Sequence, residues 1–150
     1  DASGDILDVG SGYGPIGLSV AYAYPNKNVE MVDVNSRAVQ LAKENAILNN
    51  VSNTYIHESD VFSEVKNTSF AVVLTNPPIR AGKKVVHEIF EKGFEHLSSN
   101  GELWVVIQKK QGAPSAMEKM EALFGNVEVI AKKKGYFILV SKKIDSDFGL

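Results

Sequence analysis

Short apolar runs alternate with longer amphipathic stretches along most of the chain. The runs have the length of buried strands, and the stretches between them show the three- and four-residue apolar spacing of helices. The pattern predicts strands at residues 6–9, 29–33, 54–57, 70–74, 102–108, 127–131 and 136–141. It predicts helices at residues 15–23, 37–49, 84–97 and 114–123. Ser36 is the expected N-cap of the second helix, and Leu41 and Leu48 are expected on its apolar face.

The order of these elements predicts an α/β fold. Strands that alternate with helices form a parallel sheet covered on both faces. The last two strands are joined by a short turn at residues 132–135, which permits only an antiparallel pairing. We therefore expect a Rossmann-like, seven-stranded, mostly parallel sheet with one antiparallel strand and helices on both faces.

Composition excludes several classes of protein and site. The chain is 44% hydrophobic and 23% charged, which is ordinary for a globular domain. No apolar run approaches the roughly 20 residues that cross a bilayer, and the first residues do not have the pattern of a signal peptide. Cysteine is absent, and the three histidines show no metal-ligand spacing; His87 and His96 are expected on a helix surface. We therefore expect a cytoplasmic protein with no membrane partner and no metal.

Three glycines separate the first strand from the first helix, in the segment Asp8-Val-Gly10-Ser-Gly12-Tyr13-Gly14-Pro. Glycines allow a tight turn and bring a ligand close to the main chain, beside the free N–H groups of the helix start. Residues 12–17 also match GxGxxG, which alone is a weak sign of an NAD-dependent oxidoreductase. However, the match begins three residues after the strand, and Asp8 would repel a pyrophosphate. A cationic ligand such as S-adenosylmethionine fits better, and a purely structural turn is the alternative.

Two other strand ends carry candidates for binding an adenosyl group. Asp33 can accept hydrogen bonds from both ribose hydroxyls, and Val34 follows it. After the third strand, Asp60 can accept a hydrogen bond from the adenine amino group while the Val61 N–H donates one to the ring. The alternatives are a helix cap for Asp33 and a solvated loop acid for Asp60.

The fourth strand ends in a rigid corner, Asn76-Pro77-Pro78-Ile79. Each proline fixes its own φ, restricts the residue before it and lacks an N–H. The corner therefore presents carbonyl oxygens and the Asn76 amide, which can accept both hydrogens of an amino group. An ordinary strand terminator is the alternative.

Together these motifs resemble class I S-adenosylmethionine-dependent methyltransferases of the methyltransferase small domain family, and most closely the guanine-N2 methyltransferases of small-subunit ribosomal RNA. The resemblance lies in residues 5–14, 32–35, 58–62 and 75–79. It implies cofactor contacts from the glycine loop and the next two strand ends: Asp8, Gly10, Gly12, Tyr13, Gly14, Asp33, Val34, Asp60 and Val61. It implies that the catalytic corner consists of Asn76, Pro77, Pro78 and Ile79, with Asn76 also beside the cofactor.

The sequence departs from the family pattern in two places. The family commonly has an aromatic residue where this chain has Ile79, so Tyr13 or Arg80 would have to contact the base instead. Relatives also carry a segment ahead of the first strand. Residues 1–150 are therefore expected to form a single methyltransferase domain that lacks an N-terminal extension.

Charge is distributed unevenly and bears on the partner. Residues 1–60 contain eight acids and three bases, whereas residues 61–150 contain ten acids and thirteen bases. Five bases follow the fourth and fifth strands: Arg80, Lys83, Lys84, Lys109 and Lys110. At the carboxyl edge of the sheet they would suit a phosphate backbone, although a solvated surface is the alternative. No role is assigned to residues 132–134.

The sequence therefore predicts an N-methyltransferase that acts on the exocyclic amine of a guanine, with ribosomal RNA or the small ribosomal subunit as its partner. Three alternatives stay open. One is a protein glutamine methyltransferase, and another is a non-catalytic RNA-binding module that keeps the fold. The third, a DNA adenine methyltransferase, is disfavoured because no target-recognition domain is evident.

Overall fold

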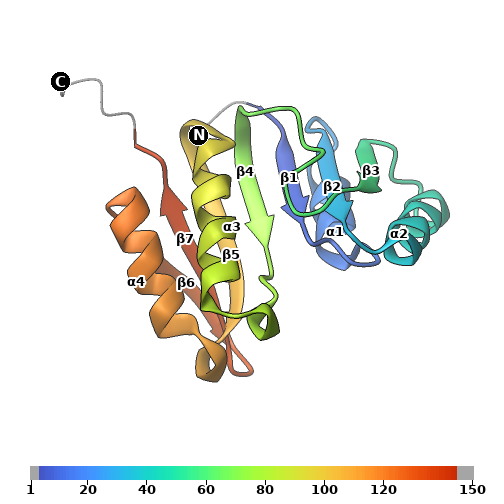
Figure 1. Ribbon diagram of the computed structural model, residues 1–150. Helices are drawn as coiled ribbons and strands as arrows, with labels where there is room; N and C mark the ends of the chain where they lie inside the picture. Colours follow the sequence, from blue (N-terminus) through green and yellow to red (C-terminus); the bar gives the residue numbers. More distant parts are fainter. Residues whose placement is uncertain (1–3, 145–150) are drawn as a thin grey trace.

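The computed structural model describes residues 4–144 (Figure 1). Its seven strands are β1 (Ile6–Val9), β2 (Val29–Asp33), β3 (Thr54–Glu58), β4 (Phe70–Thr75), β5 (Leu97–Gln108), β6 (Glu128–Lys133) and β7 (Tyr136–Lys142). The α-helices are α1 (Pro15–Ala23), α2 (Ser36–Leu48), α3 (Lys83–Glu95) and α4 (Ala113–Phe124). Two short 3-10 helices, η1 (Ile79–Ala81) and η2 (Lys109–Gln111), follow β4 and β5.

The strands form one sheet in the order β3-β2-β1-β4-β5-β7-β6. Pairing is parallel from β3 through β5, and β7 runs antiparallel to both of its neighbours. The reversal follows from the two-residue turn between β6 and β7, where Lys134 and Gly135 have φ of 52° and 83°. The predicted fold, with a single reversed strand, is confirmed.

Two apolar cores lie on opposite faces of the sheet. Helices α3 and α4 cover one face, and α1 and α2 lie on the other (Figure 1). Adjacent strand residues point to opposite faces, so Leu7 belongs to the core under α3 and α4, and Ile6 belongs to the core under α1 and α2. Both faces of the central strands are therefore apolar, as a parallel sheet requires.

Coverage of the second face is incomplete. Helices α1 and α2 pack on β1, β2 and β3, and no helix within residues 4–144 covers the same face of β4 and β5. A cavity of about 530 Å³ lies there, and Val72, Leu74 and Trp104 are among its lining residues. Lys27 and Asn100 also line it. These two residues place the cavity toward the amino ends of the parallel strands.

The structure differs from several local predictions. Asn35, not Ser36, caps α2, because its side-chain oxygen accepts a hydrogen bond from the Ala38 N–H at 3.0 Å. Leu41 and Leu48 are exposed, and α2 instead buries its smaller residues Val39, Ala42 and Ala46. The predicted surface position of His96 is wrong, because that ring is buried and packs against the Phe62 ring. Strand β5 begins at Leu97, five residues earlier than expected.

Among the described residues, 4–144, no helix is both long and apolar enough to span a bilayer.

Candidate functional site

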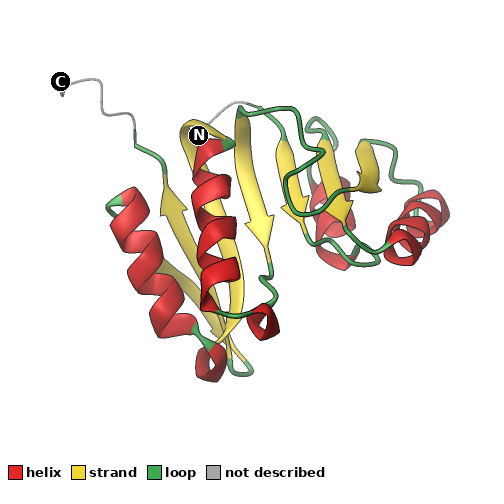
Figure 2. Ribbon diagram, viewed as in Figure 1, coloured by secondary structure: helices red, strands yellow, loops and turns green. Residues whose placement is uncertain are grey.

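The strand register brings the sequence motifs to one edge of the sheet. Val9 of β1 is paired with Val32 of β2 and with Thr75 of β4. The next residues, Gly10, Asp33 and Asn76, therefore start neighbouring loops, on strands spaced about 4.8 Å apart. Figure 2 shows these loops together at the lower edge of the sheet. Because β1 lies between β2 and β4, this edge is also the topological switch point, where α/β folds bind ligands.

The glycine loop follows the predicted backbone requirement. Gly10 and Gly12 have φ of 76° and 60°, and a Cβ at either position would meet no atom within 4 Å. Glycine is needed there for the left-handed backbone and not for space. The loop is held by two hydrogen bonds, in which the Gly10 and Ser11 N–H groups donate to the Val32 carbonyl at 2.9 Å.

Asp33 connects the glycine loop to the start of α2. Its Oδ2 accepts a hydrogen bond from the Gly12 N–H and its Oδ1 accepts one from the Asn35 N–H, both at 2.9 Å. Each carboxylate oxygen retains a second lone pair, so the side chain can still accept bonds from a ligand. Asn45 of α2 adds another connection, because its Nδ2 donates to the Tyr13 carbonyl at 3.1 Å. In the sequence, Asn45 is only a polar residue that interrupts the apolar face expected for this helix.

A buried acid lies beneath the loop. The Asp8 side chain is 4% exposed, and its Oδ2 has no hydrogen-bond partner among residues 4–144. Burial is the main reason that the pKa of Asp8 rises to about 7; the nearby backbone N–H of Gly17 opposes this rise, and the Asp33 carboxylate adds to it. The Ser11 Oγ is also buried without a partner within that range. Buried polar atoms are normally paired, so these two atoms mark a place for a hydrogen-bond donor.

Helix α1 approaches this acid closely. A Cβ at Gly17 would lie 2.8 Å from the Asp8 Oδ2 and 2.8 Å from the Met31 Sδ. Glycine at this position therefore lets the first turn of α1 pack directly over the carboxylate. The helix begins after Gly14 with no side-chain cap, so its first N–H groups also face the loop.

The loop after β3 contains a strained backbone. Val61 has φ of 55°, a left-handed conformation that β-branched residues rarely adopt. The buried Ser59 maintains it, because its hydroxyl donates to the Val61 carbonyl at 2.8 Å and accepts from the Glu64 N–H at 3.0 Å. The Asp60 side chain is exposed. Strain of this kind is often retained where a loop serves a ligand, and Ser59 was not recognised from the sequence.

The proline corner leaves one of its predicted acceptors, the Asn76 side chain, accessible. Asn76 is exposed, and its side chain has no hydrogen-bond partner among residues 4–144. Pro77 is buried, and the Pro78 carbonyl accepts a hydrogen bond from the Ala81 N–H at 2.9 Å to start η1. Ile79 is half-buried and packs against the core under α3 and α4. An exposed aromatic residue at this edge is Tyr13, 59% exposed, on the neighbouring loop.

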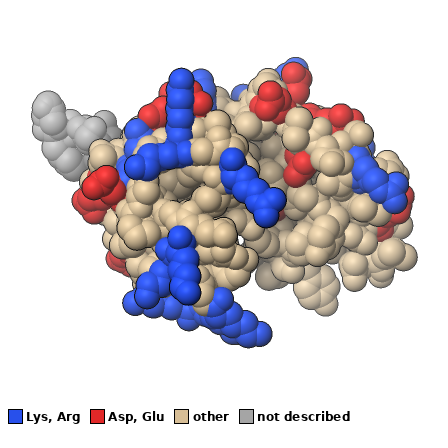
Figure 3. Space-filling model, turned by 60° about the horizontal axis from the view of Figure 1, so that its bottom comes forward, with Lys and Arg blue, Asp and Glu red and all other residues tan. Residues whose placement is uncertain are grey.

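The five predicted substrate-binding bases lie on the same side of the molecule. Arg80 is in η1, Lys83 and Lys84 form the first turn of α3, and Lys109 and Lys110 are in η2. All five are exposed. We call this set the basic rim. Figure 3 brings this edge of the sheet forward and shows Lys and Arg gathered along it.

Within residues 4–144, no cluster of three or more potential ligand side chains is arranged to hold a metal ion.

Comparison with known proteins gives matches over nearly the whole chain. The profile of the methyltransferase small domain family matches residues 1–140. The uncharacterized protein YbxB of Bacillus subtilis is 60% identical over 145 residues, which cover 96% of this chain and 72% of YbxB. The ribosomal RNA small subunit methyltransferase C of Vibrio cholerae is 29% identical over 145 residues, which cover 94% of this chain and 41% of that protein.

A second kind of relative modifies protein. The release factor glutamine methyltransferase of Flavobacterium psychrophilum is 31% identical over 133 residues, which cover 71% of this chain and 47% of that protein. The chain therefore spans less than half the length of these named methyltransferases.

Solved structures share the fold. The Thermus thermophilus 16S rRNA N2 G1207 methyltransferase RsmC, in complex with AdoMet and guanosine, aligns with a TM-score of 0.81 at 22% identity. The alignment covers 95% of this chain and 38% of RsmC. A methyltransferase from Pyrococcus furiosus aligns with a TM-score of 0.82 at 23% identity, covering 96% of this chain and 77% of that one.

Proposed function

Because the chain belongs to the methyltransferase small domain family, as the match over residues 1–140 shows, we propose that it methylates the exocyclic amino group of a guanine in small-subunit ribosomal RNA. The family match confirms the predicted class of enzyme, an S-adenosylmethionine-dependent methyltransferase. The guanine substrate and the residues that act on it are the proposal.

One observation carries the proposal: an unpaired buried carboxylate and an unpaired exposed amide occur on adjacent strands, near their carboxyl ends. Asp8 lies on β1 and Asn76 directly follows β4. S-adenosylmethionine would supply an electrophilic methyl group on a sulfonium. The residues present fit this cofactor, since Asp8 Oδ2 and Ser11 Oγ lack the donor that its ammonium group offers, and Asp33 keeps lone pairs for ribose hydroxyls.

The proline corner would orient the nucleophile. The nitrogen of an aromatic amine is a poor nucleophile, because its lone pair is delocalised into the ring. The Asn76 side-chain oxygen and the Pro77 carbonyl can each accept a hydrogen bond from one of the two amine N–H groups, and so favour a pyramidal nitrogen. Both contacts strengthen as positive charge builds on the nitrogen, so they stabilise the transition state more than the bound substrate. Positioning of this kind can contribute up to about 7–11 kcal/mol toward lowering the barrier, and no strong base is needed.

Two features favour RNA as the substrate. The basic rim adjoins the proposed site, and lysine and arginine side chains at such a place neutralise phosphates. Relatives named as ribosomal RNA methyltransferases align over 94% of the chain. A second candidate is methylation of a protein glutamine, supported by the similarity to release factor glutamine methyltransferases and by a corner that would hold an amide nitrogen equally well.

Labelled S-adenosylmethionine distinguishes the candidates. The protein is incubated with small ribosomal subunits, with protein-free ribosomal RNA and with a release factor, and incorporated label is counted. We expect label in the RNA of one or both ribosomal samples, recovered as N2-methylguanosine after digestion. Label confined to the release factor would instead establish the glutamine methyltransferase. Label in none of them, together with S-adenosylhomocysteine binding, would indicate a non-catalytic module.

A further inference from the structure

The turn between β6 and β7 lies beside the basic rim, although it is more than 20 residues away along the sequence. Strand β7 runs antiparallel to β5, so its first residue, Tyr136, pairs with the last residue of β5, Gln108. The Lys109 N–H donates to the Gly135 carbonyl at 2.8 Å, and the Gln108 Nε2 donates to the Tyr136 hydroxyl at 2.9 Å. The turn is therefore joined to η2, which carries two rim lysines.

This turn concentrates positive charge. Lys132, Lys133 and Lys134 are all exposed, and we call them, with Gly135 and Tyr136, the β6–β7 tip. The whole chain has a net charge of −2, so three consecutive lysines are a local departure from its average. None of the ion pairs found within residues 4–144 involves the tip or the rim.

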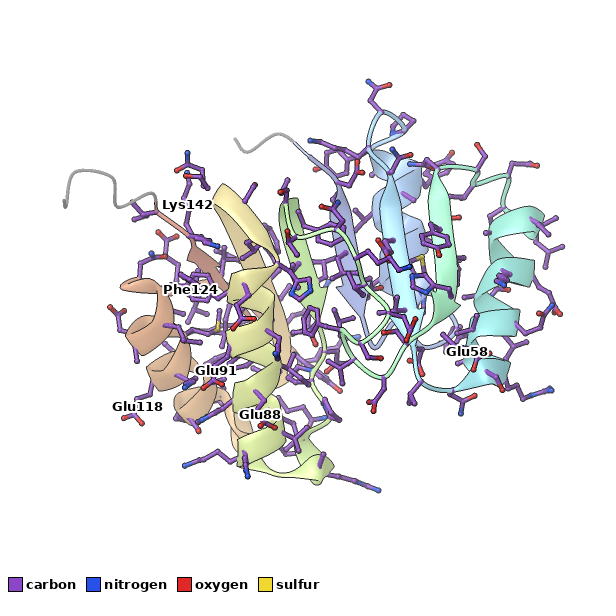
Figure 4. The ribbon with its side chains drawn as sticks, turned by 45° about the horizontal axis from the view of Figure 1, so that its top comes forward. Glu58, Glu88, Glu91, Glu118, Phe124 and Lys142 are labelled. Atoms are coloured by element: carbon purple, nitrogen blue, oxygen red, sulfur yellow. The ribbon has the colours of Figure 1, made fainter. Side chains whose placement is uncertain are left out.

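No acid of α3 or α4 forms an ion pair with the tip lysines among residues 4–144. Figure 4 labels three acids of α3 and α4, Glu88, Glu91 and Glu118, and all of them project from the helices that cover one face of the sheet. Glu91 is already paired with Lys119 at 2.7 Å. The lysines of the tip thus present their charge to a partner outside the chain.

Turn geometry does not explain the lysine at position 134. Lys134 and Gly135 occupy the two central positions of the turn with positive φ, where Asn-Gly is the favoured pair. A lysine at φ of 52° is sterically less suited than asparagine. The Lys132 ammonium lies 5.3 Å from the centre of the Phe137 ring, so it is partly engaged in packing. Lys133 and Lys134 are therefore the two lysines of the turn whose charge remains available to a partner.

We propose that the β6–β7 tip, with Lys109 and Lys110, binds the phosphate backbone of the RNA substrate and holds it against the site; this rests on the proposed function. Lysine contacts phosphate as a point charge on a flexible stem, which suits a backbone whose sequence is not read. Tyr136, 39% exposed, places an aromatic ring among these charges, on which an unpaired base can stack. Positive charges beside an aromatic stacking surface are typical of sites for single-stranded nucleic acid, so we favour single-stranded RNA over an acidic protein surface.

A double substitution removes the charge without harming the turn. In Lys133→Gln/Lys134→Asn, asparagine suits the left-handed position at least as well as lysine. The matched control is Lys43→Gln/Lys66→Gln, which changes net charge equally at exposed sites on α2 and in the loop before β4. Lys133→Arg/Lys134→Arg retains both charges. Dissociation constants are measured by fluorescence anisotropy with a fluorescein-labelled fragment of small-subunit ribosomal RNA, over a series of salt concentrations.

We expect the charge-removing variant to bind this RNA about tenfold more weakly at low salt. The slope of log affinity against log salt should fall by roughly 1 to 2, because each lost phosphate contact lowers it by about 0.7 to 1. The control and the arginine variant should keep the wild-type slope. All variants should keep the wild-type melting temperature and affinity for S-adenosylhomocysteine.

Two results would overturn the proposal. One is a charge-removing variant whose affinity and slope equal those of the Lys43/Lys66 control. The other is weaker binding with an unchanged slope, since phosphate contacts must alter it. Methyl transfer by the wild type to the same RNA, measured in parallel, separates the two hypotheses. If the wild type labels RNA while the tip variant binds normally, only the tip proposal fails; if the wild type labels a release factor instead, the proposed function fails with it.

Discussion

The two halves of the sheet's carboxyl edge are built differently. The half formed by β1, β2 and β3 contains three acids: Asp8, buried near the end of β1, Asp33 at the end of β2, and Asp60 in the loop after β3. The loops of this half are fixed by hydrogen bonds between backbone and side chains. The edge formed by β4, β5 and β7 presents exposed lysines and arginine, without ion-pair partners among residues 4–144. A preorganised, partly buried half suits a small ligand of fixed shape, whereas an exposed charged half suits a long polyanion. The proposed chemistry takes place at Asn76, where the halves meet.

The largest effect is expected at that boundary. Asn76→Ala removes one of the two acceptors for the amine and should lower turnover by about two to three orders of magnitude. The affinity for S-adenosylhomocysteine, measured by calorimetry, should change by no more than a few-fold. Near wild-type methylation by the variant would remove the proline corner from the mechanism.

Asp8 tests whether the half formed by β1, β2 and β3, where we place the cofactor, contains a buried charge. Its pKa rises from 3.8 to about 7 on folding, so the folded protein holds a proton that the unfolded chain releases between these pH values. In the unliganded wild type, the contribution of Asp8 to the free energy of unfolding should therefore be largest below about pH 4. It should fall as the pH rises toward 7. In Asp8→Asn this loss is absent. Between low and high pH, the wild type should lose a few kcal/mol of unfolding free energy more than Asp8→Asn does, since each unit of pKa shift corresponds to about 1.4 kcal/mol.

Denaturation of both proteins at pH 5, 6, 7 and 8 measures this difference. The wild type should lose stability relative to Asp8→Asn across the series. Its affinity for S-adenosylhomocysteine should rise over the same range, because the ammonium of that ligand favours the ionised carboxylate. Parallel stability curves would show that Asp8 titrates normally.

Asp33 tests the same half through a hydrogen-bond network. Asp33→Ala should weaken S-adenosylhomocysteine binding by roughly 1–3 kcal/mol, because charged hydrogen bonds to the ribose are lost and Gly12 loses its acceptor. Binding of RNA should stay at the wild-type level, since the basic rim is unchanged. Unaltered cofactor affinity in a titration calorimeter would exclude Asp33 from the site.

The smallest effect is expected in the half formed by β4, β5 and β7, where we place the RNA substrate. Lys109→Gln/Lys110→Gln should weaken RNA binding by about an order of magnitude or less and reduce its salt dependence, while affinity for S-adenosylhomocysteine stays constant. Lys43→Gln/Lys66→Gln again serves as the control. Equal salt slopes for the two variants would mean that the rim lysines are ordinary solvated side chains.

Local pattern predicted most of the fold. Apolar runs located the strands because their residues are buried on both faces, and the glycine and proline motifs located the ends of β1 and β4. Helix α2 was harder. Asn35 and Ser36 are both good caps, and only the hydrogen bond to Ala38 decides between them. Leu41 and Leu48 suggested an apolar face, but α2 approaches the sheet through small residues.

Long-range contacts explain what the sequence did not reveal about the site. Asn45 acts through the Tyr13 carbonyl, 32 residues away along the chain, which its own helix does not indicate. Ser59 bonds within its own loop, to Val61 and Glu64, but serine is too common in loops to mark that role. The buried His96 ring packs against the Phe62 ring, with 4.5 Å between the two ring centroids. Helical periodicity cannot predict such a contact. The β6–β7 tip joins the rim only because β7 lies between β5 and β6, a strand order that charge patterning does not encode.

The part of the sheet that α1 and α2 leave uncovered also has a spectroscopic consequence. Trp104, the single tryptophan of the chain, lines that cavity beside Leu74, and its indole N–H donates to the Glu102 carboxylate at 2.9 Å. Indole emission moves to shorter wavelength when water is excluded from the ring. The unlabelled protein thus carries its own fluorescent reporter: a blue shift of the Trp104 emission indicates that a bound molecule covers this face.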